Sequence, residues 1–221
     1  MKGSVITRER VLVVEDDGFT RMLLCSQLRE QGFEVVGEAS TCAEGMARVK
    51  REEPDVILVD LDLGPGPNGV DLAYGARKFL PSVGIVLLST YVDIRLIGDF
   101  RPLPTGAVFV VKRSLTDVEA LKSAIRIAVD PHLAPDLKHL LVARGLPKLR
   151  DGQIEIMRLV ACGYSNSEIA NQRVLTEKAV AKAISRLIVQ LGLTPAKEKN
   201  PRILITQAYF ILITGSALVG G

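Results

Sequence analysis

The sequence predicts a doubly wound α/β domain with a five-stranded parallel sheet, followed by an all-α domain that contains a helix-turn-helix. Five short runs rich in valine, isoleucine and leucine alternate with segments of helical period, which is typical of parallel strands joined by crossover helices. Nearer the carboxyl terminus, a short helix, a tight turn and a longer helix follow one another. We therefore expect two domains within the 221 residues.

Each element of the first domain has its own signal in the sequence. Strands are expected at residues 11–14, 35–36, 56–59, 85–88 and 108–111, and helices at residues 19–31, 41–51, 70–79, 92–100 and 114–129. Gly32 provides a helix stop, and Thr41 with Glu44 forms a capping box. The helix at 92–100 is the least defined, because Pro102 and Pro104 curtail it.

Polar side chains follow the carboxyl ends of four of these strands. Right-handed crossovers bring the carboxyl ends of parallel strands to one edge of the sheet. We therefore expect five side chains to converge there: Glu15, Asp16, Asp60, Ser89 and Lys112. Taken alone, Asp60 could simply begin the Gly/Pro-rich turn that follows it, and each of the others could cap a strand end. Their convergence on one rim favours a shared chemical role.

Three acids, a hydroxyl and an ammonium suit phosphoryl transfer to a carboxylate. Clustered carboxylates repel one another unless a divalent cation offsets their charge, and hard oxygen ligands suit Mg²⁺. The cation and Lys112 would offset the charge of the transferred group, and Ser89 could donate a hydrogen bond to a phosphoryl oxygen. One of the carboxylates would then act as the nucleophile.

Composition and charge limit the class of protein. Of all residues, 48% are hydrophobic and 24% are charged, as in soluble globular proteins. The three cysteines lack CxxC spacing and the amino terminus has no apolar signal core, so we expect a cytoplasmic protein. Residues 1–130 hold 16 Lys/Arg and 19 Asp/Glu, a balance of −3, whereas residues 148–221 hold 10 and 5, a balance of +5. The basic second part points to nucleic acid as a partner.

A change of composition separates the two domains. Three prolines and both histidines lie within residues 130–147, which we interpret as a linker between domains at residues 1–129 and 148–221. Ser165 and Glu168 form a capping box for a helix at 167–172, and Thr176 caps a longer helix at 177–190. A solvated basic helix in a bundle is one interpretation of that longer helix. The other is a DNA-binding helix whose contacts are Lys178, Lys182, Ser185 and Arg186.

Residues 9 to about 130 resemble the receiver domain of two-component response regulators, which has a flavodoxin-like fold. The resemblance rests on the acidic pair and the acid-terminated strand described above, and on the positions of Ser89, Phe109 and Lys112. It implies that Asp60 is the phosphorylation site. It also implies that Ser89 and Phe109 move on phosphorylation, although burial in the core would explain Phe109 equally well.

The same resemblance implies a set of metal ligands. Asp16, Asp60 and the backbone carbonyl of Asp62 would bind Mg²⁺ directly, and Glu15 would act mostly through water. The loop after Asp60 departs from the family. The family's Pro and Gly positions fall to Pro65 and Gly69, each one residue later than usual, which indicates an insertion in the loop at residues 64–68. The implied ligands all lie outside this insertion.

The second domain resembles the LuxR-type DNA-binding domain. The resemblance rests on Gly-Tyr-Ser-Asn-Ser-Glu-Ile-Ala at 163–170, Thr-Glu-Lys-Ala-Val at 176–180 and Leu-Gly-Leu at 191–193. A receiver joined to such a domain is similar to the NarL/FixJ family of transcriptional regulators. The family's Lys and His after the helix valine are Ala181 and Ala183 here, and its Thr-Pro before the first helix is Arg150-Asp151. The resemblance therefore implies a DNA-binding domain, but it does not imply which residues contact individual bases.

The carboxyl-terminal segment is unusually apolar. A helix is expected from about Arg202, and residues 203–221 carry no charge over a length that reaches the membrane-span threshold of about 18. Polar residues and three glycines in this segment argue against a span. We expect Phe210 and Ile213 to bury a contact with a second copy of the chain or with the receiver. The helix should bury one stripe against its own domain: Leu204, Ala208, Ile211 and Leu212.

Together these features predict a two-component response regulator. It would accept a phosphoryl group on Asp60 from a sensor histidine kinase and regulate transcription by sequence-specific DNA binding, as a homodimer with no membrane partner. It would be no enzyme beyond its own phosphorylation and dephosphorylation. One alternative is a response regulator whose helical domain contacts protein or RNA. A more distant alternative is a phosphatase or hydrolase that uses the acidic rim.

Overall fold

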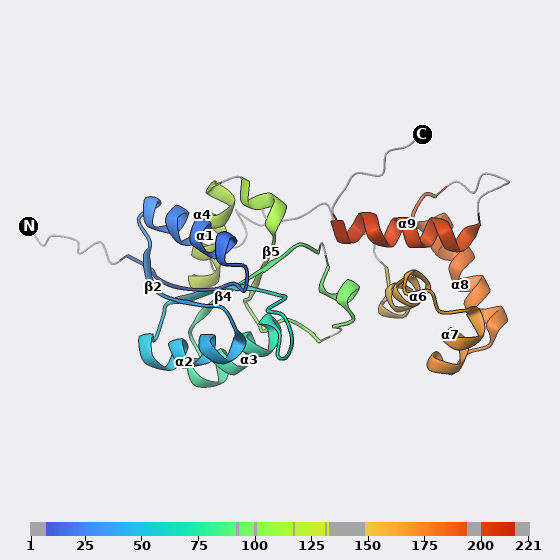
Figure 1. Ribbon diagram of the computed structural model, residues 1–221, viewed down its shortest axis with the longest axis horizontal. Helices are drawn as coiled ribbons and strands as arrows, with labels where there is room; N and C mark the ends of the chain where they lie inside the picture. Colours follow the sequence, from blue (N-terminus) through green and yellow to red (C-terminus); the bar gives the residue numbers. More distant parts are fainter. Residues whose placement is uncertain are drawn as a thin grey trace, which may run out of the picture. The chain divides into compact units, whose positions relative to one another are not determined.

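The computed structural model describes residues 8–91, 93–99, 101–116, 118–130, 132, 149–193 and 200–214 (Figure 1). The chain divides into two compact units. The first comprises Met1–Ser89 and Pro102–Ala143, and the second comprises Thr90–Arg101 and Arg144–Gly221. Most of the predicted linker, at residues 133–147, lies outside the described residues.

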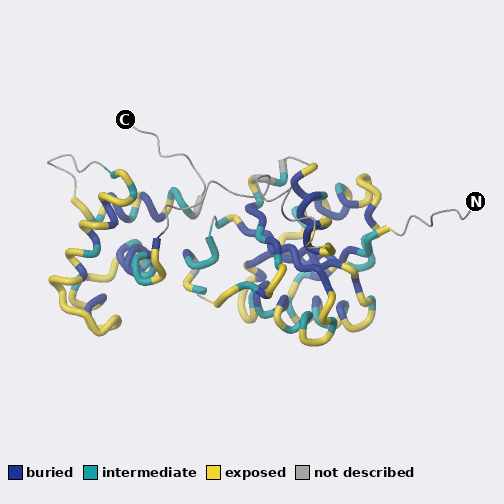
Figure 2. Tube along the Cα trace, turned by 180° about the vertical axis from the view of Figure 1, so that it is seen from behind, coloured by how far each residue is buried: buried dark blue, intermediate teal, exposed yellow. Residues whose placement is uncertain are grey.

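The first unit is built on a five-stranded parallel sheet of order β2-β1-β3-β4-β5, so the predicted fold class is confirmed. Strands β1, β3 and β4 are buried almost throughout, because helices cover both faces of the sheet (Figure 2). Each strand includes the residues predicted from its apolar run. The strands are β1 (Arg10–Val14), β2 (Glu34–Ala39), β3 (Val56–Asp60), β4 (Gly84–Ser89) and β5 (Val108–Val111).

Helices α1 (Gly18–Glu30) and α4 (Val118–Val129) cover one face of this sheet, and α2 (Cys42–Glu52) and α3 (Gly69–Phe79) cover the other (Figure 1). On the first face, Val11 and Val13 pack with Leu28 and Ile125. Half of the capping box predicted for α2 is confirmed, since the Glu44 amide donates to Thr41 Oγ1 at 3.2 Å. The Glu44 carboxylate instead accepts from the Ser40 amide, at 2.9 Å. Helix α4 begins later than predicted, because the 3₁₀ turn η2 (Lys112–Thr116) precedes it.

The connection between β4 and β5 differs from the prediction. Instead of a helix over residues 92–100, the described residues 93–99 contain one 3₁₀ turn, η1 (Ile94–Ile97). Asp93 caps the turn by accepting a hydrogen bond from the Arg95 amide, and Gly98 ends it in a left-handed conformation at φ +86°. The left-handed Gly98 therefore ends the turn before Pro102 is reached.

Besides η1, the second unit contains four α-helices among its described residues: α6 (Asp151–Ala161), α7 (Asn166–Arg173), α8 (Glu177–Gln190) and α9 (Pro201–Thr214). The capping box of α7 is confirmed, since Glu168 accepts from the Ser165 amide at 2.7 Å and the Glu168 amide donates to Ser165 Oγ at 3.2 Å. The turn between α7 and α8 includes Val174 in the left-handed region at φ +52°. This arrangement is the predicted helix-turn-helix.

Helix α9 buries more of its surface than the predicted stripe. Of the predicted stripe, Leu204 and Ala208 are buried, whereas Ile211 and Leu212 are only half-buried. Ile205 and Tyr209, which were not predicted, are buried as well. Phe210 is 53% exposed, and the side chain of Ile213 lies outside the described residues. In the part of the chain that the structure describes, no helix combines the length and the apolar character that crossing a membrane requires.

Candidate functional site

The topology of the sheet brings the acidic residues together. Strand β1 pairs in parallel with β3, and Val14 stands opposite Val59, so the residues that follow the two strands become neighbours. Carboxylate oxygens of Glu15, Asp16 and Asp60 lie within 4.8 Å of one another. Two of these side chains are buried, Glu15 at 1% and Asp60 at 6% exposure, whereas Asp16 is exposed. The site is therefore a partly buried acidic cluster that opens to solvent at Asp16.

Lys112 enters this cluster from the end of β5. Its Nζ donates hydrogen bonds to Asp60 Oδ2 at 2.9 Å and to Glu15 Oε1 at 3.0 Å, and lies 2.8 Å from Glu15 Oε2. Ser89 ends β4 next to β3 and is 1% exposed. The structure thus brings Glu15, Asp60 and Lys112 into direct contact, with Ser89 at the end of the neighbouring strand.

Burial sets the electrostatics of the cluster. Desolvation raises the pKa of both Asp60 and Glu15, although hydrogen bonds from Lys112 oppose the rise. Burial alone would lower the pKa of Lys112, but its hydrogen bonds to Glu15 and Asp60 outweigh burial and raise that pKa. The raised pKa of Lys112 favours its charged form, which faces the carboxyl groups of both Glu15 and Asp60.

The donor set fits a hard divalent cation. Three carboxylates within reach of one point offer the oxygen ligands that Mg²⁺ prefers, and one ammonium leaves their charge incompletely balanced. The carboxylate of Asp62 stands apart from them. It is exposed, and its Oδ1 accepts a hydrogen bond from the Gly64 amide at 3.3 Å.

A close backbone contact holds the loop after Asp60. Gly69 begins α3, and its amide donates to the Leu61 carbonyl at 2.9 Å. A Cβ at this position would lie 2.2 Å from the Asp60 carbonyl oxygen, so only glycine fits without displacing the backbone of the acidic residue. The longer loop before it is exposed at residues 64–67, and Asn68 caps α3 together with Asp71. Residues 64–67 therefore lie in solvent, apart from the buried side chains of the acidic cluster.

One residue near the site, Arg21, was not predicted from the sequence. Arg21 in α1 donates from Nη1 to the Glu15 carbonyl at 2.5 Å and to the Asp16 carbonyl at 3.4 Å, which holds the loop that carries the acidic pair. The position of Arg21, one turn into α1 and close in sequence to the acidic pair, is the signal that could have indicated these contacts.

Phe109, expected to be a switch residue, is half-buried in β5 opposite Leu87.

The predicted nucleic-acid side of α8 is open to solvent. Arg186 lines a groove with Arg150 and Gln153 of the α6 amino terminus, and Gln153 Nε2 donates to Gln190 Oε1 at 2.7 Å. Arg150 was not predicted as part of this basic surface. All four predicted side chains on the helix are exposed: Lys178, Lys182, Ser185 and Arg186.

A receiver fold with an acidic cluster and a converging lysine defines the class of phospho-acceptor regulators. The chain belongs to the response regulator receiver domain family, because the sequence model of that family matches residues 11–126. It is 28% identical to the response regulator protein VraR of Staphylococcus aureus over 191 residues, which cover 82% of this chain and 90% of that protein.

Solved structures of RcsB share this fold. A structure of two RcsB dimers bound to two parallel DNAs has a TM-score of 0.59 and 18% identity, covering 94% of this chain and 100% of that chain. RcsB from Salmonella enterica serovar Typhimurium, bound to promoter rprA in the presence of the phosphomimetic BeF3-, has a TM-score of 0.54 and 17% identity, covering 95% of this chain and 100% of that chain.

Proposed function

We propose that the chain is a two-component response regulator that is phosphorylated on Asp60 by a sensor histidine kinase and regulates transcription by binding DNA. The observation that carries this proposal is the buried Asp60 carboxylate, held 2.9 Å from Lys112 at the rim where Glu15 and Asp16 also lie. We assign the receiver to residues 1–129, the linker to residues 130–147 and the helical output domain to residues 148–221.

The chemistry follows from the groups at the rim. A carboxylate oxygen of Asp60 attacks phosphorus, the P–N bond of the kinase phosphohistidine breaks, and the imidazole leaves with its bonding electrons and takes up a proton. Lys112 stabilises the oxygens of the transferred group, and Ser89 donates a hydrogen bond to one of them. No other catalysis than this phosphorylation and its reversal is assigned to the chain.

Mg²⁺ is the cofactor that suits this site. Asp16, Asp60 and the carbonyl of Asp62 would hold the ion, and Glu15 would reach it mostly through water. When bound, the ion offsets the negative charge that builds up during phosphoryl transfer. The side chains of Glu15 and Asp60 are buried, so water screens their attraction to the ion only weakly.

The surface beside the rim suits a kinase. Helix α1 begins two residues after Asp16 and exposes three large apolar side chains on one side: Phe19 at 66%, Met22 at 56% and Leu23 at 51%. An exposed apolar patch of this kind marks an interaction surface. A helical partner that presents a phosphohistidine would bury this patch while its phosphoryl group reaches Asp60.

DNA is the proposed partner of the helical unit. The exposed basic side of α8 supplies the positive charge that phosphates attract, and RcsB proteins of the same fold are described as complexes with DNA. Lys182 and Arg186 are the leading candidates for phosphate contacts. The RcsB dimers on DNA also support a homodimer as the bound form.

Labelling with a small acyl phosphate in Mg²⁺ tests the acceptor. Intact mass should show one phosphoryl group per chain, and Asp60→Asn should abolish the label while the control Asp62→Asn, whose side chain stands outside the cluster, should retain it. Steady turnover of phosphate esters without a labelled chain would support a hydrolase and contradict the proposal.

A further inference from the structure

A basic groove lies on the helical unit, between the amino terminus of α6 and the carboxyl-terminal half of α8. Its volume is about 530 Å³, and every residue that lines it belongs to the second unit. Two arginines and two glutamines offer their side chains to this space, together with one alanine. The lining residues are Arg150, Gln153, Ala183, Arg186 and Gln190.

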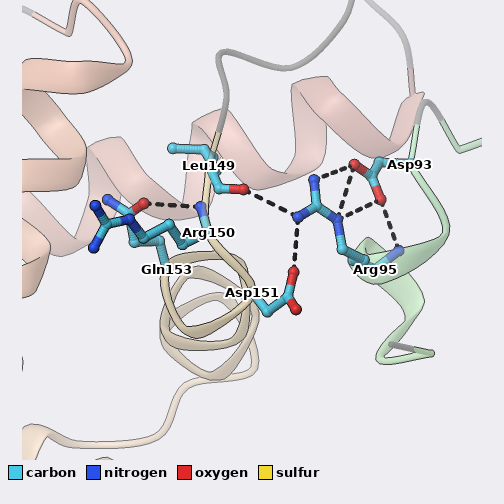
Figure 3. Close-up of polar contacts among 6 residues, drawn as sticks. All are labelled: Asp93, Arg95, Leu149, Arg150, Asp151 and Gln153. Carbon is cyan, nitrogen blue, oxygen red and sulfur yellow. Dashed lines mark hydrogen bonds and ion pairs between the residues drawn. The ribbon is translucent and has the colours of Figure 1, made fainter. Parts of the chain in front are cut away.

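Two hydrogen bonds join the helices on either side of the groove. The Arg150 amide donates to Gln153 Oε1 at 2.9 Å (Figure 3), and Gln153 Nε2 donates to Gln190 Oε1 at 2.7 Å. Gln153 therefore holds the first turn of α6 beside the last turn of α8. The backbone of Arg150 is fixed by the same contacts, so its side chain begins at a defined place next to the groove.

The two arginines of the groove keep their positive charge for a ligand. Among the residues that the structure describes, neither Arg150 nor Arg186 forms an ion pair. The acid next to Arg150 in the sequence, Asp151, is paired instead with Arg95 of the same unit at 2.8 Å. Figure 3 shows the Arg150 guanidinium directed away from Asp151, on the side of Gln153. The groove therefore suits an anionic ligand.

The groove continues the exposed basic side of α8. Lys182, Arg186 and Gln190 are spaced four residues apart, so they follow one another along one side of the helix. All three are exposed. A row of positive groups matches a polyanion with repeated phosphates better than it matches one small anion. A DNA backbone in contact with Lys182 and Arg186 therefore extends into the groove.

Two positions that depart from the LuxR-type pattern meet in this groove. Ala183 has only a methyl group where the family has His, so it leaves space beside α8. Arg150 supplies a guanidinium where the family has Thr. The chain thus lacks two contact side chains on α8, at Ala181 and Ala183, and gains a cationic side chain at the start of α6.

We propose that this groove is a second DNA-contact site, in which Arg150 binds a backbone phosphate of the duplex that α8 contacts. The inference rests on the proposed function, in which Lys182 and Arg186 contact DNA phosphates. A guanidinium binds phosphate through charge-assisted hydrogen bonds, which are stronger than neutral ones. Because a phosphate contact carries no sequence information, Arg150 strengthens the binding of every duplex.

The salt dependence of duplex binding by the full chain tests this site. Fluorescence anisotropy of a labelled mixed-sequence duplex DNA is measured over a range of salt concentrations, with and without an acyl phosphate and Mg²⁺. Variants are compared in the state that binds more tightly. Arg150→Ala should lower the affinity about 2- to 10-fold, the range expected for one hydrogen-bonded contact. It should also lower the slope of log affinity against log salt by about 0.9, whereas Arg150→Lys should keep the slope.

An arginine of the other unit provides the matched control. The side chain of Arg29 is 55% exposed on α1, and Arg29→Ala should leave both affinity and slope at their wild-type values. Arg150 is also exposed, so Arg150→Ala should keep the wild-type circular dichroism spectrum. A loss of affinity with an unchanged spectrum then reports a lost contact and not a lost fold.

The outcomes separate this site from the proposed function. A lower slope for Lys182→Ala with a wild-type slope for Arg150→Ala would overturn the site in the groove and leave α8 as the DNA-binding helix. A wild-type chain that does not bind the duplex, or binds it without salt dependence, would contradict the proposed function itself. Tighter binding of an RNA duplex of the same sequence would overturn the assignment of the groove to DNA.

Discussion

Lys112 is the residue that offsets part of the charge of the acidic rim. It lies between Asp60 and Glu15, which are 8% and 1% exposed in their side chains. The ammonium and a divalent cation compete for the same carboxylate oxygens, because both are attracted to the same negative charge. Either Lys112 or a divalent cation can therefore offset the negative charge of the carboxylates.

The variant Lys112→Ala should reveal that competition. We expect the metal-free protein to lose up to about 3 kcal/mol of unfolding free energy, since two buried carboxylates lose their partner. Mg²⁺ should then raise the melting temperature of the variant more than that of the wild type. Calorimetry measures both, which suits a chain without tryptophan.

A surface lysine provides the control for this experiment. Lys122 pairs with Glu119, which is 66% exposed, and such a pair contributes at most about 1 kcal/mol. Lys122→Ala should therefore leave the response to Mg²⁺ as it is in the wild type. Equal responses of both variants would contradict a role for Lys112 in the metal site.

Gly69 offers a second prediction at this scale. A Cβ at this position would lie 2.2 Å from the Asp60 carbonyl oxygen, so Gly69→Ala should cost about 1–3 kcal/mol and displace the acceptor residue. Gly18→Ala is the control, because its nearest atom would be 3.8 Å away and alanine favours a helix. Urea unfolding followed by circular dichroism compares the two. A Gly69 variant as stable as the Gly18 variant would rule out the close contact.

The side chains that form the acidic cluster could be predicted from the sequence. The side chains that donate hydrogen bonds to backbone carbonyls could not. Strand periodicity and crossover handedness place Asp60 beside Glu15 without any coordinates. The contact of Arg21 with the carbonyls of Glu15 and Asp16 depends on the exact exit angle of α1, which periodicity does not determine. The same holds for the hydrogen bond between Tyr209 and Leu96.

At the scale of elements, α8 presents a buried side and a charged side. Val180, Ile184 and Leu187 face the core, and the helix carries Lys182 and Arg186 on its exposed side. The same division was predicted from the period of the sequence, because a helix in a small bundle must bury one stripe. The exposed side is therefore available to a charged partner.

The salt dependence of binding tests α8 directly. If Lys182 and Arg186 contact phosphates, each alanine variant should lower the slope of log affinity against log salt by about 0.9. Lys50→Ala is a suitable control, since Lys50 is exposed on α2 of the other unit. Fluorescence anisotropy with labelled duplex DNA gives the slopes. Identical slopes for all three variants would exclude α8 as the phosphate-binding helix.

The β4–β5 connection shows where sequence reasoning about elements ends. Its apolar residues and the nearby prolines indicated a short helix, and the structure has a single 3₁₀ turn. Hydrophobicity predicts that Leu96 is buried but not which core receives it, because both units offer apolar surface. Only the tertiary structure assigns residues 90–101 to the second unit.

At the scale of the whole molecule, an apolar surface remains on α9. Ile203 and Phe210 are 54% and 53% exposed and lie seven residues apart, on one side of the helix. Helix α9 also supplies buried residues, among them Ile205 and Tyr209, so its removal would unfold the unit rather than test a surface. A point substitution at an exposed position is the appropriate test.

Phe210→Asp should therefore weaken a homodimer that uses this surface while it preserves the fold. We expect sedimentation to show a lower dimer fraction than in the wild type at equal concentration, with an unchanged circular dichroism spectrum. Gln207→Asp changes an exposed residue of the same helix that is already polar and provides a comparison for the added charge. A dimer fraction unaffected by Phe210→Asp would exclude this surface from the dimer.

The central claim is that the charge state of Asp60 controls what the helical unit binds. The most direct measurement is selection of duplex DNA by the full chain, followed by anisotropy titration of the enriched sequence, with and without an acyl phosphate and Mg²⁺. The account predicts an enriched sequence whose affinity changes by about tenfold or more on phosphorylation, equivalent to about 1.4 kcal/mol, and no change in Asp60→Asn. Equal affinities of the labelled and unlabelled wild type, or no enriched sequence in either state, would contradict it.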